Sequence, residues 1–526
     1  MTLRGQARAW IADEVDPEAA QELQALLDHD ADDELADRFA APLTFGTAGL
    51  RGPLRAGPNG MNRAVVRRAA AGVATWLRDH DRTGAVVVLG HDARHGSREF
   101  AHDSAAVFAA AGFDARVLPG PLPTPVLAYA VQRLDAAAGV MVTASHNPAQ
   151  DNGYKVYAGD GAQIVPPADT EIEAAIHAAG ATADIALDDS YTVLDDSLVS
   201  DYVRDVVGLV TDGPRELRIV HTAMHGVGAR TMAAVFAAAG FADVHPVPEQ
   251  QQPDPDFPTV AFPNPEEPGA LDLALELARA QEADVVIAND PDADRCAVAV
   301  PSPDGWRMLR GDEVGVLLAD ALMRRGVRGT YATTVVSSSL LGAMARRSGV
   351  GYAETLTGFK WISRAADDLV FGYEEALGYA VAPDLVRDKD GISAALLVAE
   401  LAADLEATGS SLLDRLDNLA RVYGRYATDQ VSIRVDDLSV ITDLMRRLRD
   451  DPPAQLAGHD VEVEDLLPRT DAVRWRWASG RVVVRPSGTE PKLKAYLEVV
   501  EPSGSAALAA TALTRLRGEV EALLAR

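Results

Sequence analysis

Between residues 41 and 424, short apolar runs alternate with amphipathic stretches. Apolar β-branched runs at 85–89 and 137–142 predict buried strands, and the stretch from Ser97 to Ala111 predicts a helix that Ser97 caps and Gly112 ends. Further strands are predicted at 217–220, 283–288, 331–336 and 369–373, and further helices at 229–239, 313–325 and 340–347. Strands that alternate with helices are typical of α/β layers.

The two ends of the chain have a different pattern. Residues 1–40 read as an acidic helical lead-in. After residue 424 we expect a strand at 430–435, a helix at 441–449, strands around Ser479 and Gly480 within 473–484, and a closing helix at 506–524. We therefore predict an α/β fold of three consecutive α/β modules with mixed sheets and a smaller C-terminal α+β domain. The predicted domains are 1–205, 206–308, 309–424 and 425–526.

Composition narrows the possible partners. Of the 526 residues 48% are apolar, so every domain can bury a core. The formal net charge is 49 − 78 = −29, which repels nucleic acid and anionic membranes, and we expect neither as a partner. A single cysteine, Cys296, excludes intrachain disulfides, and neither an apolar signal core nor a membrane-length apolar run is present. We expect a cytoplasmic protein.

Three aspartates follow the strand predicted at 283–288. On an extended loop, Asp290, Asp292 and Asp294 would point to one side, and three hard oxygen ligands suit Mg²⁺. An EF-hand is excluded, because its sixth position would be Arg295 and its twelfth Pro301. The remaining alternatives are a plain acidic turn and a phosphatase that uses Asp290 as its nucleophile.

Ser145 follows another predicted strand, in a short polar turn. A serine there is either a nucleophile or a helix cap. A hydrolase triad does not fit, because the chain lacks a G-x-S-x-G elbow and His146 would point away from Ser145 on an extended chain. Asn152-Gly153 indicates a tight turn that would bring Lys155 back beside Ser145. The alternative for Lys155 is a solvated lysine.

Two more segments carry candidate chemistry. The segment after the strand at 481–484 combines Arg485, Ser487, Gly488 and Thr489, which are the parts of a phosphate cradle, although a plain turn is equally consistent. In the third module, the paired acids Glu374 and Glu375 suit sugar hydroxyls, Lys389 suits proton transfer, and residues 356–361 lie nearby in the chain; each of these could also be a surface residue.

Together the motifs resemble those of the α-D-phosphohexomutase superfamily along almost the whole chain. The shared motifs are Thr143-Ala-Ser-His-Asn-Pro, Asp290-Pro-Asp-Ala-Asp-Arg, Glu374-Glu-Ala-Leu-Gly and Arg485-Pro-Ser-Gly-Thr-Glu-Pro. The resemblance implies four domains around a central cleft. It also implies an isomerase of the phosphoglucomutase/phosphomannomutase type that depends on Mg²⁺ and works through a phosphoserine and a sugar 1,6-bisphosphate.

The resemblance also implies site residues, position by position. Ser145 would be the phosphoserine, and the metal ligands would be Ser145, Asp290, Asp292 and Asp294. The other catalytic residues would be Arg51, His146, Lys155 and Lys389. Substrate-binding residues would be Arg295, Thr357, Gly358, Lys360, Glu374, Glu375, Arg485, Ser487, Gly488 and Thr489.

One position departs from the family pattern and affects the expected substrate. Many glucose- and mannose-active members carry Ser where this chain has Ala376, and two segments, 151–157 and 356–362, resemble the branch that includes phosphopentomutases. We expect glucose 1-phosphate and glucose 6-phosphate as the substrate pair, with phosphomannomutase and phosphopentomutase as alternatives and a metal-dependent sugar phosphatase as the alternative of another class. Partners would be small-molecule sugar phosphates, and the sequence does not predict an oligomeric state.

Overall fold

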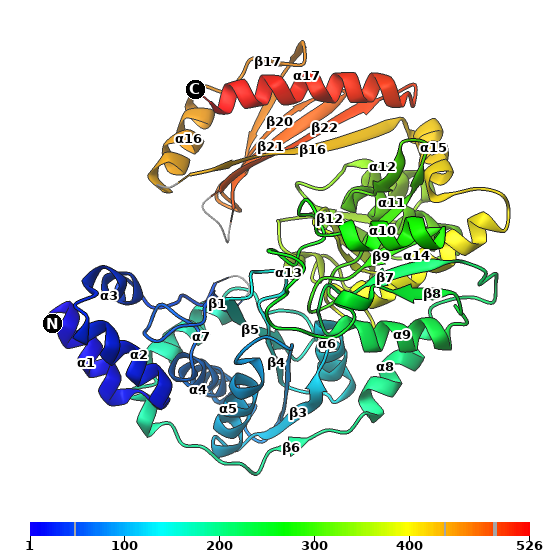
Figure 1. The fold of residues 1–526 in the computed structure, drawn as a ribbon. Helices are drawn as coiled ribbons and strands as arrows, with labels where there is room; N and C mark the ends of the chain where they lie inside the picture. The colour runs from blue at the N-terminus through cyan, green and yellow to red at the C-terminus, as the bar shows by residue number, and fades with distance from the viewer. Residues whose placement is uncertain (47–48, 436–437, 488–491, 526) are drawn as a thin grey trace. The chain divides into compact units, whose positions relative to one another are not determined.

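A computed structural model describes residues 1–46, 49–435, 438–487 and 492–525 (Figure 1). The chain forms two compact units. The first contains Met1–Met308 and Gly378–Ala403, and the second contains Leu309–Leu377 and Asp404–Arg526. None of the helices in the described ranges combines the length and the apolar character that a membrane span requires.

The predicted helical lead-in consists of α1 (Leu3–Asp13), α2 (Pro17–Asp28) and α3 (Asp32–Phe39). The side chain of Asp16 caps α2 by accepting the Glu18 N–H at 3.0 Å, and Pro17 occupies the first turn, where its missing N–H costs nothing. The three helices bury a small apolar cluster around Leu23 and Leu35.

The first α/β domain is built on a six-stranded mixed sheet with the order β1-β5-β4-β2-β3-β6. Strands β2, β3, β4 and β6 run parallel, whereas β1 and β5 are antiparallel to their neighbours. The strands are β1 (Leu50–Pro53), β2 (Val86–His91), β3 (Asp114–Pro121), β4 (Ala138–Val142), β5 (Asp151–Ala158) and β6 (Thr192–Val193). The helices are α4 (Arg63–Asp79), α5 (Ser97–Ala110), α6 (Thr124–Arg133), α7 (Ala168–Ala178), the short η1 (Thr182–Asp184) and α8 (Ser197–Val207).

The start of α5 differs from the prediction. Gly96 occupies the cap position with φ 75°, and Ser97 is the first helical residue. The Ser97 hydroxyl instead donates to Asp92 Oδ1 at 2.6 Å, so it is not a helix cap. Gly112, with φ 87°, directly follows the helix end as predicted.

The second α/β domain has a five-stranded sheet with the order β11-β10-β9-β7-β8. Strands β9 and β10 form an antiparallel hairpin, and their connection carries the three aspartates. The strands are β7 (Ile219–Thr222), β8 (Val244–Pro246), β9 (Val285–Ala288), β10 (Ala297–Ser302) and β11 (Gly305–Met308). The helices are α9 (Gly228–Ala238), the short η2 (Pro248–Gln250) and α10 (Asp272–Gln281). The first unit also takes in β15 (Gly378–Ala380) and most of α14 (Gly391–Glu406).

The second unit begins with a parallel sheet in which β12 lies between β13 and β14. Its strands are β12 (Thr330–Thr334), β13 (Gly351–Thr355) and β14 (Leu369–Glu374). Its helices are α11 (Gly311–Arg324), α12 (Leu340–Ser348), α13 (Phe359–Ile362) and α15 (Leu412–Tyr423).

The C-terminal domain is a five-stranded antiparallel sheet with the order β16-β22-β21-β20-β19. Figure 1 shows α17 running along one face of this sheet, and its Leu516 and Val520 pack in one apolar cluster with Val473 and Trp475. The elements are β16 (Arg425–Arg434), α16 (Leu438–Asp450), β17 (Gln455–Leu456), β18 (His459–Asp460), β19 (Glu462–Asp465), β20 (Val473–Trp477), β21 (Gly480–Pro486), β22 (Lys492–Glu501) and α17 (Ala506–Leu524). The predicted α/β class with mixed sheets is confirmed, while the exact domain boundaries stay predictions.

Candidate active site

Ser145 lies in the loop that joins β4 to β5. Its backbone is left-handed, with φ 52°, and its N–H donates to Thr143 Oγ1 at 2.9 Å. The loop leads into β5, so the interpretation of Ser145 as a helix cap is wrong. Because the backbone is not extended, His146 does not point away as we expected: its Nδ1 lies 3.2 Å from Ser145 Oγ.

Lys155 lies on β5 and is almost fully buried. Asn152-Gly153 is part of β5 and not a tight turn; residues 143–150 reverse the chain instead. The antiparallel register places Lys155 opposite Met141 on β4. Its Nζ lies 2.7 Å from Asp292 Oδ2 and 3.0 Å from Asp294 Oδ2, so the alternative of a solvated lysine is wrong.

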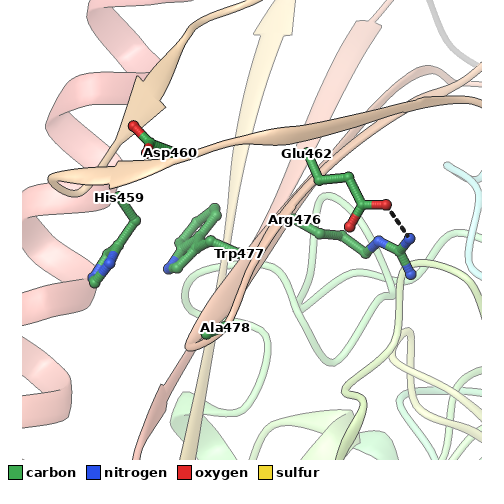
Figure 2. Close-up of a pocket in the computed structure, with 6 residues that line it drawn as sticks. All are labelled: His459, Asp460, Glu462, Arg476, Trp477 and Ala478. Carbon is green, nitrogen blue, oxygen red and sulfur yellow. Dashed lines mark hydrogen bonds and ion pairs between the residues drawn. The ribbon is translucent and has the colours of Figure 1, made fainter.

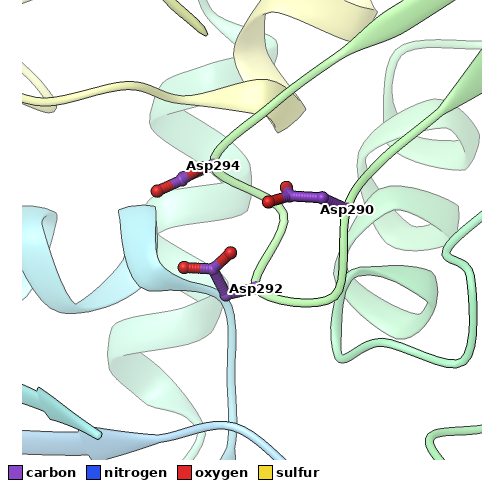
Figure 3. A group of neighbouring side chains, drawn as sticks. All are labelled: Asp290, Asp292 and Asp294. Atoms are coloured by element: carbon purple, nitrogen blue, oxygen red, sulfur yellow. The ribbon is translucent and has the colours of Figure 1, made fainter. Parts of the chain in front are cut away.

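The three aspartates converge at the end of β9 (Figure 3). All three are at most 1% exposed, and each offers a carboxylate oxygen within 4.8 Å of the others. We expected an extended loop, but the loop turns. Ala293 has φ 54° and its N–H donates to Asp290 O at 2.8 Å, which directs the carboxylates inward. The three carboxylates therefore converge as predicted, but because the loop turns and not because it is extended.

The aspartate cluster fits a divalent cation. Asp292 Oδ1 and Asp294 Oδ1 are buried and accept no hydrogen bond from any residue that the structure describes. Buried carboxylate oxygens without donors are costly, and a hard cation relieves that cost. Ser145 Oγ donates to Asp290 Oδ2 at 2.9 Å, so the serine lies directly beside these oxygens. Asp290, Asp292 and Asp294 could therefore hold Mg²⁺ next to Ser145.

The carboxylates and amines of this cluster shift one another's proton affinities. Burial raises the pKa of Asp290 well above its usual range, and the negative charges of Asp292 and Asp294 raise it further. Burial would also raise the pKa of Asp292 and lower that of Lys155. Their mutual attraction outweighs burial, so the pKa of Asp292 is lowered and that of Lys155 is raised. These two groups therefore form an ion pair inside the cluster.

Three other predicted cations lie in the same unit. Lys389 Nζ is 3.2 Å from Asp294 Oδ2, and Arg51 donates to Asn147 Oδ1 at 3.0 Å, next to the Ser145 loop. The backbone N–H of Arg295 donates to Asp290 Oδ1 at 3.0 Å, and its guanidinium lies 3.7 Å from Glu266. Burial lowers the pKa of Arg51, as expected for a cation that has lost water.

The sequence analysis missed Arg94, which organises the serine loop. Its buried guanidinium donates to the carbonyl oxygens of Ser145 and Asn147, both at 2.6 Å, and of Pro148 at 2.7 Å. Its Nε lies 3.2 Å from Asp92 Oδ2. One arginine thus fixes the backbone that presents the serine. One signal in the sequence could have identified Arg94: it is a cation just after β2, and ligands gather at the carboxyl ends of strands in α/β sheets.

Two glycines pack closely against the backbone of the aspartate loop. A Cβ on Gly391 would lie 2.1 Å from Arg295 O, and a Cβ on Gly226 would lie 2.2 Å from Pro291 Cα. Neither distance is sterically possible, so any side chain at these positions must displace the backbone of the aspartate loop.

The remaining predicted residues lie in the second unit. Glu374 ends β14, and Glu375 Oε2 accepts hydrogen bonds from Ser337 at 2.8 Å and Thr334 at 3.2 Å. Thr357 and Gly358 precede α13; Lys360 is buried on α13, with Nζ 5.4 Å from the Trp361 ring centroid. Arg485 lies on β21, and the Ser487 N–H donates to Lys492 O at 2.8 Å. Gly488 and Thr489 lie outside the described residues.

Comparison with known proteins identifies the family. The description "Phosphoglucomutase/phosphomannomutase, alpha/beta/alpha domain" matches at residues 42–183 (domain I), 200–305 (domain II) and 310–423 (domain III), and the C-terminal domain of the same family matches at 434–514. The chain belongs to the phosphoglucomutase/phosphomannomutase family. It is therefore an isomerase that transfers a phosphoryl group within a sugar phosphate.

Individual relatives agree on the family and differ in their sugars. A probable phosphomannomutase from Haemophilus influenzae is 47% identical over 84% of this chain and 93% of its own length. The phosphopentomutase of Homo sapiens is 36% identical over 90% of this chain and 87% of its own length. A crystal structure of a putative phosphomannomutase from Thermus thermophilus has a TM-score of 0.73 at 29% identity, covering 91% of this chain and 99% of that chain.

Proposed function

We propose that this mutase interconverts α-D-glucose 1-phosphate and glucose 6-phosphate, with Ser145 as the carrier of the phosphoryl group. The observation that supports Ser145 is its hydroxyl 2.9 Å from Asp290 Oδ2, at the edge of three buried carboxylates that fit Mg²⁺. A carrier must stand next to the groups that stabilise the transferring phosphoryl, as the Ser145 hydroxyl does.

In the first half-reaction, a free hydroxyl of the sugar monophosphate attacks the phosphorus of phosphoserine 145. The new O–P bond forms, the Oγ–P bond breaks, and the proton of the attacking hydroxyl ends on Ser145 Oγ. We assign the movement of this proton to Lys155 and Lys389, the two buried amines beside the aspartates. Arg51 and Arg295 would stabilise the charge on the transferring group. A bound Mg²⁺ would withdraw electron density from the phosphoryl oxygens.

The second half-reaction requires the sugar 1,6-bisphosphate to turn around and return its other phosphoryl to Ser145. The distal site must then bind either phosphate. We assign this role to Arg485, Ser487, Gly488 and Thr489, which offer a guanidinium, hydroxyls and backbone N–H groups. We assign Glu374 and Glu375 to the sugar hydroxyls, and Thr357, Gly358 and Lys360 to further substrate contacts.

A pentose phosphate is the second candidate substrate, for a specific reason. Ala376 stands where many hexose-active members carry Ser, so one hydroxyl contact to a hexose is missing. A pentose presents fewer hydroxyls and loses less by that change. The similarity to a phosphopentomutase over most of the chain supports the same candidate.

The function is tested by a coupled mutase assay with the 1-phosphates of glucose, mannose, glucosamine, ribose and deoxyribose. We expect the highest kcat/KM with glucose 1-phosphate; a higher value with ribose 1-phosphate would replace the leading substrate by the second candidate. Measuring free phosphate in the same reactions separates a mutase from a phosphatase, because only a phosphatase releases stoichiometric phosphate.

Ser145 is tested separately. Labelled glucose 1,6-bisphosphate should leave phosphate on the native chain and on the control Ser200→Ala, which changes an exposed serine of α8, but not on Ser145→Ala. Full mutase activity in Ser145→Ala would refute the assignment of the carrier.

A further inference from the structure

The second unit contains an arginine-rich cavity of about 320 Å³, and none of the residues assigned to the mutase reaction lines it. Four arginines and two glutamates face it, on a chain with a net charge of −29. The lining residues used below are Arg346, Arg476, Tyr352, Tyr426 and Trp477. Because the chain as a whole carries a large negative charge, a local excess of guanidinium groups indicates a place where an anion can bind.

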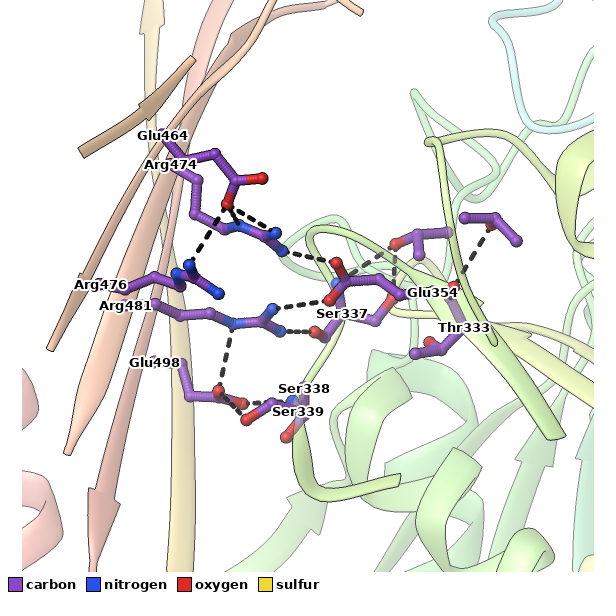
Figure 4. Close-up of polar contacts among 12 residues, drawn as sticks. Thr333, Ser337, Ser338, Ser339, Glu354, Glu464, Arg474, Arg476, Arg481 and Glu498 are labelled. Carbon is purple, nitrogen blue, oxygen red and sulfur yellow. Dashed lines mark hydrogen bonds and ion pairs between the residues drawn. The ribbon is translucent and has the colours of Figure 1, made fainter. Parts of the chain in front are cut away.

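Two of these arginines pair closely with the glutamates of the cavity. Arg474 Nη1 lies 2.6 Å from Glu354, and Arg481 lies 3.3 Å from Glu354 and 3.2 Å from Glu498 (Figure 4). These contacts neutralise the glutamates of the cavity, and the other two arginines contribute its positive charge.

The other two arginines have donors to spare. Arg346, exposed on α12, makes no hydrogen bond or ion pair with any described residue. Arg476 makes two long ion pairs through Nη2, at 3.4 Å with Glu462 and 3.7 Å with Glu464, and its buried Nε has no acceptor among the described residues. The hydroxyls of Tyr352 and Tyr426, both half-buried, likewise donate to no described residue. Four side chains thus offer unused donors to one cavity, which is the requirement for binding a phosphate.

A second, more open hollow of about 500 Å³ adjoins the cavity (Figure 2). It shares Arg476, Trp477 and Ala478 with the cavity and adds His459, Asp460 and Glu462. The rings of His459 and Trp477 are nearly parallel, at 10°, with centroids 6.4 Å apart. Aromatic faces of this kind bind planar rings, and the two carboxylates can accept N–H groups at a ring edge.

We propose that the two hollows form one binding site for a nucleotide. Arg346, Arg476 and the two tyrosine hydroxyls bind its phosphate, and Trp477 and His459 bind its heteroaromatic ring. The shared residues Arg476 and Trp477 stand where the phosphate-bearing and ring-bearing parts of such a ligand join. The volumes lie in the range of small-molecule sites. This site does not depend on the identity of the sugar substrate.

The test is titration calorimetry of AMP into the full chain, with glucose 1,6-bisphosphate present at saturation to fill the mutase site. We expect one AMP per chain, and at least tenfold weaker binding of inorganic phosphate alone and of adenosine alone. Arg346→Ala should weaken AMP binding at least tenfold, whereas Arg347→Ala, the next residue on the same helix, should not. The kcat and KM of Arg346→Ala for glucose 1-phosphate should stay within twofold of the native values.

The ring hollow is tested with Trp477→Ala and with His459→Ala, which changes an exposed side chain. Each should weaken AMP binding without changing the affinity for phosphate. Absence of AMP binding at millimolar concentration would refute the proposal. So would AMP binding that survives both Arg346→Ala and His459→Ala, or inorganic phosphate binding as tightly as AMP.

Discussion

Two charge clusters, one in each unit, have opposite character. The aspartate cluster of the first unit has three carboxylates beside Lys155 and Lys389, and two of its oxygens have no donor among the described residues. In the cluster of the second unit, Glu354 and Glu498 each face arginine donors, and Glu498 also accepts from Ser339. Unsatisfied buried acceptors point to a ligand, whereas satisfied ones point to structure. Each prediction below tests this distinction.

The largest effect is expected for Asp290→Asn. Losing one charged oxygen ligand should reduce mutase activity about a thousandfold, or about 4 kcal/mol of transition-state stabilisation. Because the pKa of Asp290 is raised by burial and by its neighbours, removing its charge should also raise the Tm in EDTA. Activity assays and thermal unfolding measure the two effects.

Asp292→Asn is the matched control in the same loop. Its carboxylate pairs with Lys155, so this variant should lose activity and Tm together. If both variants lowered the Tm in EDTA equally, the idea of a cluster poised for a cation would fail.

Arg481→Ala should destabilise the second unit by about 3 kcal/mol, because it leaves the buried Glu498 without its arginine partner and Glu354 with one donor fewer. Arg476→Ala removes a 43% exposed side chain that has two distant partners, Glu462 and Glu464, and should cost less than about 1 kcal/mol. Denaturant unfolding measures both variants. Equal losses would show that the second cluster is not the structural one.

Asp312, also in the second unit, should make stability depend on pH. Burial raises its pKa to about 7, although it accepts hydrogen bonds from the Ser338 N–H and the Tyr373 hydroxyl. The folded state therefore holds a proton that the unfolded state releases near pH 4. The stability that this proton provides is complete below pH 4 and is lost as the pH rises through 7.

Asp312→Asn removes that dependence. Between pH 5 and 8 the native chain should lose about 2–3 kcal/mol relative to this variant. Asp367→Asn, an exposed residue of the same unit, should leave the pH profile unchanged. Parallel profiles for the native chain and Asp312→Asn would refute the shifted pKa.

The smallest effect is expected for Arg94→Lys. Lysine keeps the charge but cannot reproduce the planar donor set, so the carbonyls of the Ser145 loop lose part of their support. Activity should fall about 10- to 100-fold, with the loss in kcat and not in KM. Arg98→Lys, an exposed neighbour, is the control and should change neither. A change confined to KM would argue against a role in positioning the serine.

Helices and strands could be predicted from the sequence where their apolar residues followed a single regular spacing. The closing helix begins and ends where its apolar spacing predicts, and the three aspartates converge as their positions after a strand indicate. Two of the errors share one physical cause. Ser145 and Ala293 adopt left-handed backbones that nothing in their residue types announces, so the contacts of His146 and the inward turn of the carboxylates were not predictable.

Other features depend on tertiary contacts between distant parts of the chain. Arg94 acts on carbonyl oxygens more than fifty residues away, and any residue type supplies a carbonyl, so no sequence pattern marks its partners. The charge pairs of Arg481 depend in the same way on Glu354 and Glu498 from other strands. Local sequence patterns predicted the helices, the strands and the candidate loops. They did not predict the hydrogen bonds and ion pairs from distant residues that fix those loops in place.

Gly391 lies almost a hundred residues after the aspartates, yet its missing side chain leaves room for Arg295 O. This closeness has a consequence for genetic variation. In a library of single-codon changes scored by growth on the substrate sugar, Gly391 and Gly226 would tolerate as few replacements as the aspartates themselves, although neither carries a functional group. Intolerance at these two codons would therefore reflect the backbone conformation of the aspartate loop. It would not identify a catalytic side chain.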